Sequence, residues 1–157
     1  MFLRYYYFIL NILFISKKKF LRPKQKNFLI INGDHSELFK SYFKENEIDI
    51  VYNRFARGIE KDSIINLYIL LITILKFKFS IKEYIKNYIR ACKPKAIITL
   101  IDNDQSFYEL KNKNSNFKSI VIQNSFRSTQ NDLFAYLDEL KEKKIICDYV
   151  LTFNKYV

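Results

Sequence analysis

The sequence predicts an α/β fold in which a mostly parallel sheet lies between two layers of helices. Short apolar runs, typical of buried strands, alternate along the chain with longer stretches of helical periodicity. Polar turns follow most of the apolar runs directly. The length of 157 residues and the hydrophobic content of 49% suit one domain with a sizeable core. Together these observations predict a Rossmann-like three-layer domain over residues 27–157.

An apolar segment and a basic segment precede this domain. Residues 2–15 are nearly all apolar or aromatic, and a lysine-rich stretch follows up to residue 26. As a helix, the apolar segment would be about 21 Å long, which is short of a hydrocarbon core of roughly 30 Å. Three interpretations stay open: a helix in the membrane interface, an extra helix on the domain core, and an inner-membrane anchor with Lys17–Lys19 on the cytoplasmic side.

The first half of the domain begins with a strand and a short helix. The run Phe28–Ile31 ends in Asn32-Gly33-Asp34, which predicts a buried strand entering a turn. Ser36 is typical of a helix N-cap, and Leu38, Phe39, Tyr42 and Phe43 then share one helix face. A second strand is expected at Ile48–Tyr52.

Two helices are expected next. A strongly apolar helix runs from Ser63 to Phe77. The second covers Ile81–Cys92, where apolar residues recur at helical spacing until Pro94 ends the pattern.

In the second half, two strands and two helices alternate before a last strand. Ala96–Ile101 is the clearest buried parallel strand. The remaining expected elements are a helix at 105–113, a strand at Ser119–Gln123, a helix at Asp132–Lys143 and a strand at Lys144–Phe153.

Glycine, cysteine and histidine exclude several kinds of site. The only glycines, Gly33 and Gly58, lie too far apart for a dinucleotide fingerprint or a Walker-A loop. Cys92 and Cys147 form no C-x-x-C motif, and His35 is the only histidine, which argues against a zinc site. We expect both cysteines to be buried in a reducing, intracellular setting. No cofactor and no metal are expected.

The formal net charge of +11 is concentrated at one end of the chain. Basic residues number 27, of which 21 are lysine, and this slant is typical of an AT-rich genome. The first 26 residues carry seven basic residues and no acid. An anionic membrane surface is therefore the expected partner of residues 2–26, and nucleic acid is not.

Three polar loops directly follow predicted strands. Ligands in open parallel sheets bind beyond the carboxyl ends of the strands. These loops are Asn32–Glu37, Asp102–Gln105 and Gln123–Arg127. Their carboxylates and amides suit sugar hydroxyls, although such residues also end strands and cap helices for local reasons. The pair Asp102 and Asp104 is a weak indication of a divalent metal.

Each candidate site residue has a functional and a local interpretation. His35, next to Asp34, is the best candidate for a general base, and an exposed turn histidine is the alternative. Arg127 suits a phosphate or carboxylate, and a solvated loop arginine is the alternative. The expected substrate-binding residues are Asp102, Asn103, Gln123, Asn124 and Arg127.

Several of these strand ends resemble a known family. Lys93–Asp104 (KPKAIITLIDND), Phe107–Leu110, Ser119–Asn124 and Cys147–Asn154 resemble the amino-terminal half of bacterial surface-carbohydrate (polysaccharide) biosynthesis transferases. In that family a P-K-x-x-I-T-x-I-D-N strand end precedes an I-Q-N-G strand end. The resemblance covers roughly residues 60 to 157. It departs from the pattern at Ser125, where the family has glycine, so the turn there is expected to differ.

The resemblance implies a two-domain glycosyltransferase of the GT-B type. In such enzymes the first half handles the acceptor, and the second half binds a nucleotide-sugar without a required metal. The expected partners are thus a sugar or lipid-linked glycan acceptor, and a nucleotide-sugar held by a second domain beyond Val157. This chain alone would be inactive. Its expected location is the cytoplasm, with a peripheral position at the inner face of the cytoplasmic membrane as a further possibility. The alternative function is a non-enzymatic basic α/β module that binds an anionic membrane or nucleic acid.

Overall fold

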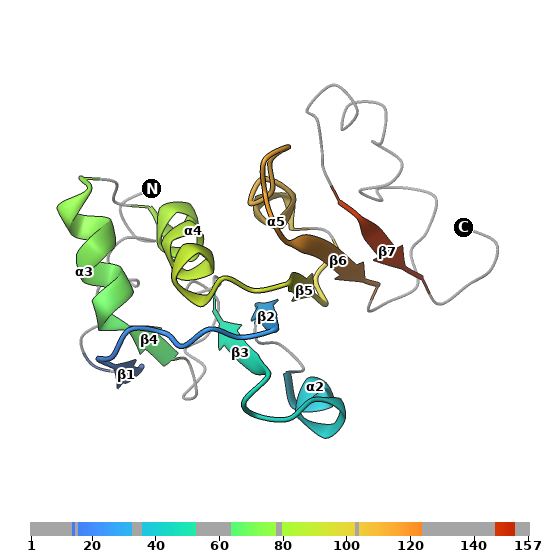
Figure 1. The fold of residues 1–157 in the computed structure, drawn as a ribbon, viewed down its shortest axis with the longest axis horizontal. Helices are drawn as coiled ribbons and strands as arrows, with labels where there is room; N and C mark the ends of the chain where they lie inside the picture. The colour runs from blue at the N-terminus through green and yellow to red at the C-terminus, as the bar shows by residue number, and fades with distance from the viewer. Residues whose placement is uncertain are drawn as a thin grey trace.

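A five-stranded parallel sheet forms the centre of the computed structural model. The structure describes residue 14 and residues 16–32, 36–52, 64–77, 80–102, 104–123 and 147–152. Its strands are β2 (Phe28–Ile31), β3 (Ile48–Val51), β5 (Ala96–Thr99), β6 (Lys118–Ile122) and β7 (Tyr149–Leu151). They lie in the order β3-β2-β5-β6-β7, and every neighbouring pair is parallel. The predicted α/β class is therefore confirmed (Figure 1).

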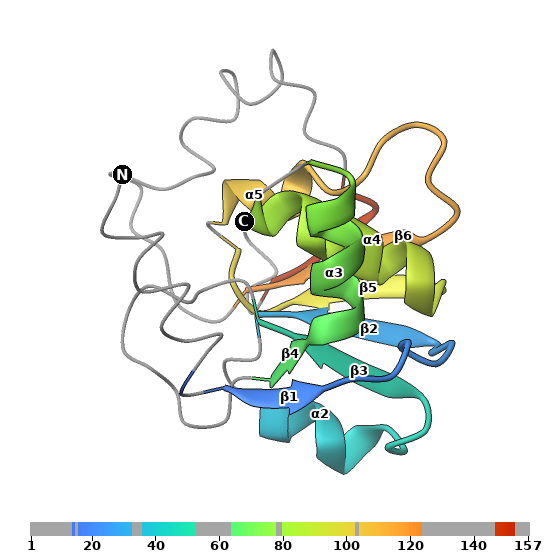
Figure 2. The ribbon, with the colours of Figure 1, turned by 90° about the vertical axis from the view of Figure 1, so that its left-hand side faces the viewer.

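Helices cover both faces of this sheet (Figure 2). On one face, Leu29 and Ile31 of β2 pack in a cluster with α3 (Leu67–Leu75), α4 (Ile81–Cys92) and α5 (Gln105–Tyr108). On the other face, Ile30 packs with Phe39 of α2 (Ser36–Tyr42). Alternate residues of one strand thus enter two cores, because successive side chains point to opposite faces. This is the three-layer, Rossmann-like arrangement.

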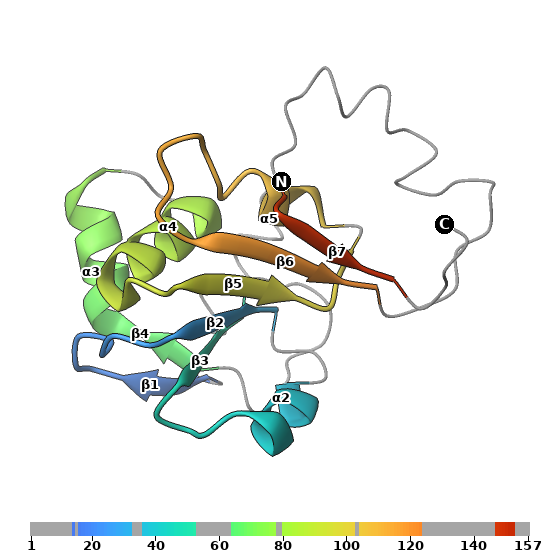
Figure 3. The same ribbon diagram turned by 45° about the vertical axis from the view of Figure 1, so that its right-hand side comes forward.

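A second, two-stranded sheet lies beside the main one (Figure 3). Its strands, β1 (Lys17–Lys19) and β4 (Ile64–Asn66), pair in parallel. The sequence predicted neither strand: it predicted a basic linker at β1 and the start of a helix at β4. The helix α3 begins only after Asn66, whose side-chain oxygen accepts the N–H of Ile69 as an N-cap. Pattern alone missed this strand because β-branched residues and the helix that follows form one apolar run.

The helix α4 has the predicted bounds. Ser80 caps its N-terminus by accepting the N–H of Glu83, and Lys93 ends it in the left-handed conformation just before Pro94. The buried face includes Tyr84, Ile85 and Tyr88.

Two helix predictions were wrong in detail. On α2, Phe39 packs in the core, and Phe43, just beyond the helix, is partly buried against the same cluster. Leu38 and Tyr42 are exposed, so the apolar face of α2 is narrower than predicted.

The helix α5 ends at Tyr108, not near residue 113. Asn112 accepts the N–H of Asn114 and the hydroxyl of Ser115, and these local bonds hold a turn where the helix would continue. The helices predicted at residues 2–15 and 132–143 lie outside the described residues, except that Phe14 is described and exposed.

Asp148 fastens the edge strand β7 to the sheet. Its carboxylate forms an ion pair with Lys111 and accepts the backbone N–H of Ser119 at 2.7 Å. These hydrogen bonds, led by that from Lys111, hold the pKa of Asp148 far below its usual range. The charged carboxylate thus stabilises the folded chain.

We expect Asp148→Asn to lower the free energy of unfolding by about 1–3 kcal/mol at neutral pH, because charge-assisted hydrogen bonds are lost next to a mostly buried lysine. A depressed folded-state pKa contributes stability above the unfolded value near pH 4, and this contribution is lost as the pH falls. Wild-type stability should therefore drop on acidification more than that of the variant. Urea unfolding between about pH 7 and pH 3 measures both.

Glu109→Gln is the matched control, since Glu109 pairs with Lys82 on the exposed surface. It should change stability by less than about 1 kcal/mol. Parallel acid profiles of wild type and Asp148→Asn would contradict the role given to Asp148.

Candidate functional site

The sheet order defines where a ligand would bind. From β2 the chain crosses to β3 through α2 on one face, and from β5 it crosses to β6 through α5 on the other face. The strands β2 and β5 are neighbours, so the direction of the connections reverses between their carboxyl ends. In doubly wound sheets of this order, ligands bind at that switch point. We therefore take the ends of β2 and β5 as the candidate site.

Asn32 is the first residue after β2 and is 2% exposed. Its backbone has φ 64°, a left-handed conformation that asparagine tolerates better than most residues. The side-chain Nδ2 donates to Asp104 Oδ2 at 2.8 Å. The side-chain Oδ1 is buried and accepts no hydrogen bond from the residues that the structure describes.

The Oδ1 of Asn32 is a buried acceptor without a donor among the described residues. A reversed amide would place this oxygen against the Asp104 carboxylate, so the hydrogen bond fixes the amide orientation. A buried acceptor without a donor costs about 1–3 kcal/mol. A ligand hydroxyl or N–H at the switch point would satisfy it.

Asp104 is held from two sides. Its Oδ1 accepts the backbone N–H and the hydroxyl of Ser106, at 3.0 and 2.6 Å, and so caps the start of α5. Its Oδ2 accepts the Asn32 amide. Asp104 is thus a positioning residue that joins the ends of β2 and β5.

Asp102 and Gln123 lie at the ends of neighbouring strands but are nearly covered. Asp102 is 1% exposed, and its backbone carbonyl accepts the Tyr108 hydroxyl at 2.7 Å. Gln123 is 6% exposed, and its N–H donates to the Leu151 carbonyl at 2.9 Å. The sheet brings both to the edge that also carries Asn32. Their predicted contact with a substrate stays a prediction.

The other predicted site residues lie outside the described residues. These are Asp34, His35, Asn103, Asn124 and Arg127. The sequence pattern predicts the loop that contains Asn32 as a site, but not Asn32 itself, and it indicates Asp104 only as a weak metal ligand. An asparagine directly after a buried strand was the available signal, because that position is where a left-handed residue ends a strand.

The cysteines are not activated thiols. Burial raises the pKa of the Cys92 thiol to about 12, and burial also raises that of Cys147. Cys92 is fully buried, as predicted, whereas Cys147 is half-buried. Because the thiolate is the nucleophile, neither is suited to covalent catalysis near neutral pH.

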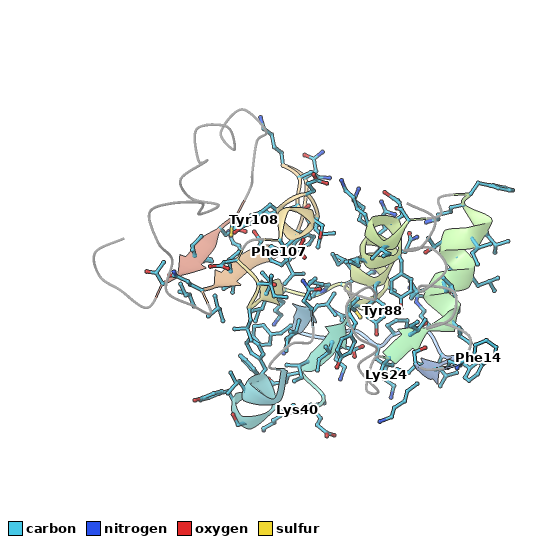
Figure 4. The ribbon with its side chains drawn as sticks, turned by 180° about the vertical axis from the view of Figure 1, so that it is seen from behind. Phe14, Lys24, Lys40, Tyr88, Phe107 and Tyr108 are labelled. Carbon is cyan, nitrogen blue, oxygen red and sulfur yellow. The ribbon has the colours of Figure 1, made fainter. Side chains whose placement is uncertain are left out.

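A basic groove lies away from the switch point, along the edge strand β3. It has a volume of about 900 Å³. Six basic residues line it against two acidic ones: Lys17, Lys19, Arg22, Lys24, Lys26 and Lys40, with Glu45 and Asp49. Figure 4 labels three of the lining residues: Lys24 from the connection between β1 and β2, Lys40 from α2 and Tyr88 from α4.

The described residues contain neither a metal-binding cluster nor a membrane-spanning helix. No group of three or more His, Cys, Asp and Glu residues in this part of the chain is arranged to hold a metal ion. None of the helices in the same ranges has the length and apolarity needed to cross a bilayer.

Comparisons with protein families, with curated proteins and with solved structures give no match for this chain.

Proposed function

We propose that this domain is the acceptor-side half of a glycosyltransferase in surface polysaccharide biosynthesis. The observation that supports it best is the fixed Oδ1 of Asn32 at the switch point, which accepts no hydrogen bond within the described part of the chain. A carbonyl oxygen held in this way accepts a hydroxyl, and sugars offer several hydroxyls in a fixed arrangement. The resemblance of the strand ends to surface-carbohydrate transferases is the second support.

In this proposal the acceptor sugar lies over the ends of β2 and β5. Asn32 Oδ1 accepts one of its hydroxyls, and Asp104 holds the Asn32 amide in place. Asp102 and Gln123 lie at the same edge, and the proposal keeps Asn103, Asn124 and Arg127 as further substrate-binding residues. His35 or Asp34 removes the proton from the attacking hydroxyl as general base. A separate second half binds the nucleotide-sugar donor.

The acceptor in this proposal is carried on a lipid, at the inner face of the cytoplasmic membrane. Phe20 and Leu21 support this placement, since they are 70% and 82% exposed and adjoin the lysines of β1. Exposed apolar residues beside cations are typical of a surface that contacts anionic lipid.

Nuclear magnetic resonance on the full chain tests the acceptor site. The probes are methyl glycosides of glucose, galactose and N-acetylglucosamine, each at millimolar concentration, and uridine diphosphate as a donor fragment. We expect one glycoside to shift the amide signals of residue 32 and of residues 99–102, whereas uridine diphosphate leaves them unchanged. Asn32→Gly keeps the left-handed backbone but removes the amide, and it should weaken glycoside binding about tenfold.

Asn114→Gly is the control, because Asn114 is exposed in the turn after α5. It should bind the glycoside like the wild type. Binding of uridine diphosphate at residue 32, or equal glycoside affinity in Asn32→Gly and wild type, would refute an acceptor site here.

The second candidate function is a binding module without catalysis. The basic groove favours it, because six cations around one hollow form a site for an anion whether or not a sugar is transferred.

A further inference from the structure

We propose that the groove between β1 and β3 is a binding site for a phosphate-bearing ligand of small-molecule size. This site lies along the edge strand β3, so it is separate from the switch point and does not rest on the proposed transferase activity. Its volume of about 900 Å³ falls within the range of small-molecule sites.

The groove is built from anchored backbone. One wall is the segment 20–26, which connects β1 to β2. Asn66 Nδ2 donates to the carbonyl of Leu21 at 2.9 Å, and the N–H of Lys26 donates to the carbonyl of Cys92 at 3.2 Å. Pro23 is buried between these two anchors. The wall is therefore held at both ends, and the backbone that carries its cations has a defined position.

Of the two acidic residues of the groove, Asp49 has a carboxylate that is already engaged. Asp49 accepts the hydroxyl of Tyr88 at 2.7 Å and pairs with Lys19 at 3.4 Å. Burial, together with the Asp49 charge, raises the pKa of Tyr88 well above its ordinary value, so the hydroxyl stays a donor. Glu45 meets Lys26 through its backbone carbonyl, at 2.7 Å from Nζ. The net charge of the lining is positive, because six basic residues face two acidic ones.

Arg22 and Lys24 are the cations best placed to meet a ligand. Both are exposed, and neither forms a hydrogen bond or ion pair with another described residue. Arginine binds phosphate oxygens in a bidentate way, and lysine adds a point charge. Apolar residues such as Ile48, Ile50 and Tyr52 also line the groove. The combination suits a phosphate or diphosphate attached to a less polar group.

The test measures binding of inorganic pyrophosphate to the full chain by calorimetry, at low and at high salt. The variant is Arg22→Gln/Lys24→Gln. The control is Lys95→Gln/Lys113→Gln, which removes the same charge from exposed lysines outside the groove. We expect the groove variant to bind at least about tenfold more weakly and the control to stay within about twofold of the wild type. All four positions are exposed, so the fold should persist in both variants.

A second arm separates the two sources of phosphate. Vesicles of phosphatidylglycerol, with vesicles of phosphatidylcholine as reference, present the phosphate as a lipid headgroup. Vesicle binding that requires Arg22 and Lys24 and is displaced by pyrophosphate assigns the groove to a headgroup. Pyrophosphate binding that depends on both residues, with vesicle binding that does not, assigns it to a soluble ligand.

Three results would overturn the site. The first is binding of neither probe. The second is an equal loss in the groove variant and the control, because net charge alone would then explain the affinity. The third is tight binding of a single-stranded oligonucleotide that depends on Arg22 and Lys24 but is not displaced by pyrophosphate. That result would make the groove a nucleic-acid site.

Discussion

Asn32→Asp should lower the free energy of unfolding by about 3 kcal/mol at neutral pH, although the two side chains have nearly the same shape. The Asn32 amide lies 2.8 Å from Asp104 Oδ2 and is almost wholly buried. The substitution replaces a hydrogen bond by two facing carboxylates. Two carboxylates at this distance cannot both ionise without a large cost.

The stability of the Asn32→Asp variant should depend on pH in the direction opposite to that of an ordinary buried, hydrogen-bonded carboxylate. One carboxyl of the pair would hold its proton, so its folded-state pKa would rise above the unfolded value near 4. A raised carboxyl pKa means that the folded state binds more protons than the unfolded state. The stability of the variant should therefore fall as the pH rises above about 4, and its loss relative to wild type should be smallest in acid. Urea midpoints across this range measure it.

The exchange variant Asn32→Asp/Asp104→Asn is the control. It restores one amide and one carboxylate at the same two positions, so much of the stability should return. The residual deficit would report the α5 cap, since an amide oxygen replaces the carboxylate that accepts Ser106. A single variant as stable as wild type at neutral pH would refute the contact on which the candidate site rests.

The main sheet could be predicted because its strands carry their own signal. The run Ala96–Thr99 is apolar up to Thr99 and buried at every position, so composition alone marks it as a central parallel strand. The helix α4 was equally clear, since a polar N-cap, helical spacing and a proline bound it. In both cases the local pattern and the tertiary environment agree.

The second sheet could not be predicted, because its strands depend on each other. Lys17–Lys19 are three exposed lysines with no strand signal of their own, and they become a strand only by pairing with Ile64–Asn66. The pairing joins segments more than forty residues apart. It also changes the meaning of the basic cluster, which forms one side of a groove as well as preceding the domain.

The candidate site was predictable in place but not in its residues. The rule that ligands bind beyond parallel strand ends selects the correct edge. Which amide is left without a donor depends on the contact between Asn32 and Asp104, and these residues are 72 positions apart in the chain. One sequence without its structure does not contain that pairing.

Asn66→Ala should destabilise the protein by about 3 kcal/mol and should also weaken pyrophosphate binding in the groove. Asn66 is 2% exposed and makes three hydrogen bonds. Its Oδ1 accepts the N–H of Ile69, its Nδ2 donates to Leu21, and its own N–H donates to the Tyr84 hydroxyl at 2.9 Å. Alanine loses the helix cap and leaves the Ile69 N–H and the Leu21 carbonyl without partners.

The substitution of Asn66 should affect the groove because the Asn66 side chain binds the backbone carbonyl of Leu21. With this carbonyl released, the segment 20–26 loses one of its two backbone anchors, and the backbone that carries Arg22 and Lys24 is held less firmly. Faster amide hydrogen exchange in this segment and weaker binding of pyrophosphate should accompany the loss of stability.

Two variants separate the contributions of Asn66. Ser80→Ala removes an exposed N-cap from α4 and should cost only about 1 kcal/mol, without any effect on pyrophosphate. Tyr84→Phe removes only the acceptor of the Asn66 N–H, so it should destabilise without loosening the segment 20–26. Two outcomes would contradict this role of Asn66. Either Asn66→Ala lowers the free energy of unfolding no more than Ser80→Ala does, or it binds pyrophosphate as tightly as the wild type. In either case other contacts hold the wall of the groove and its cations.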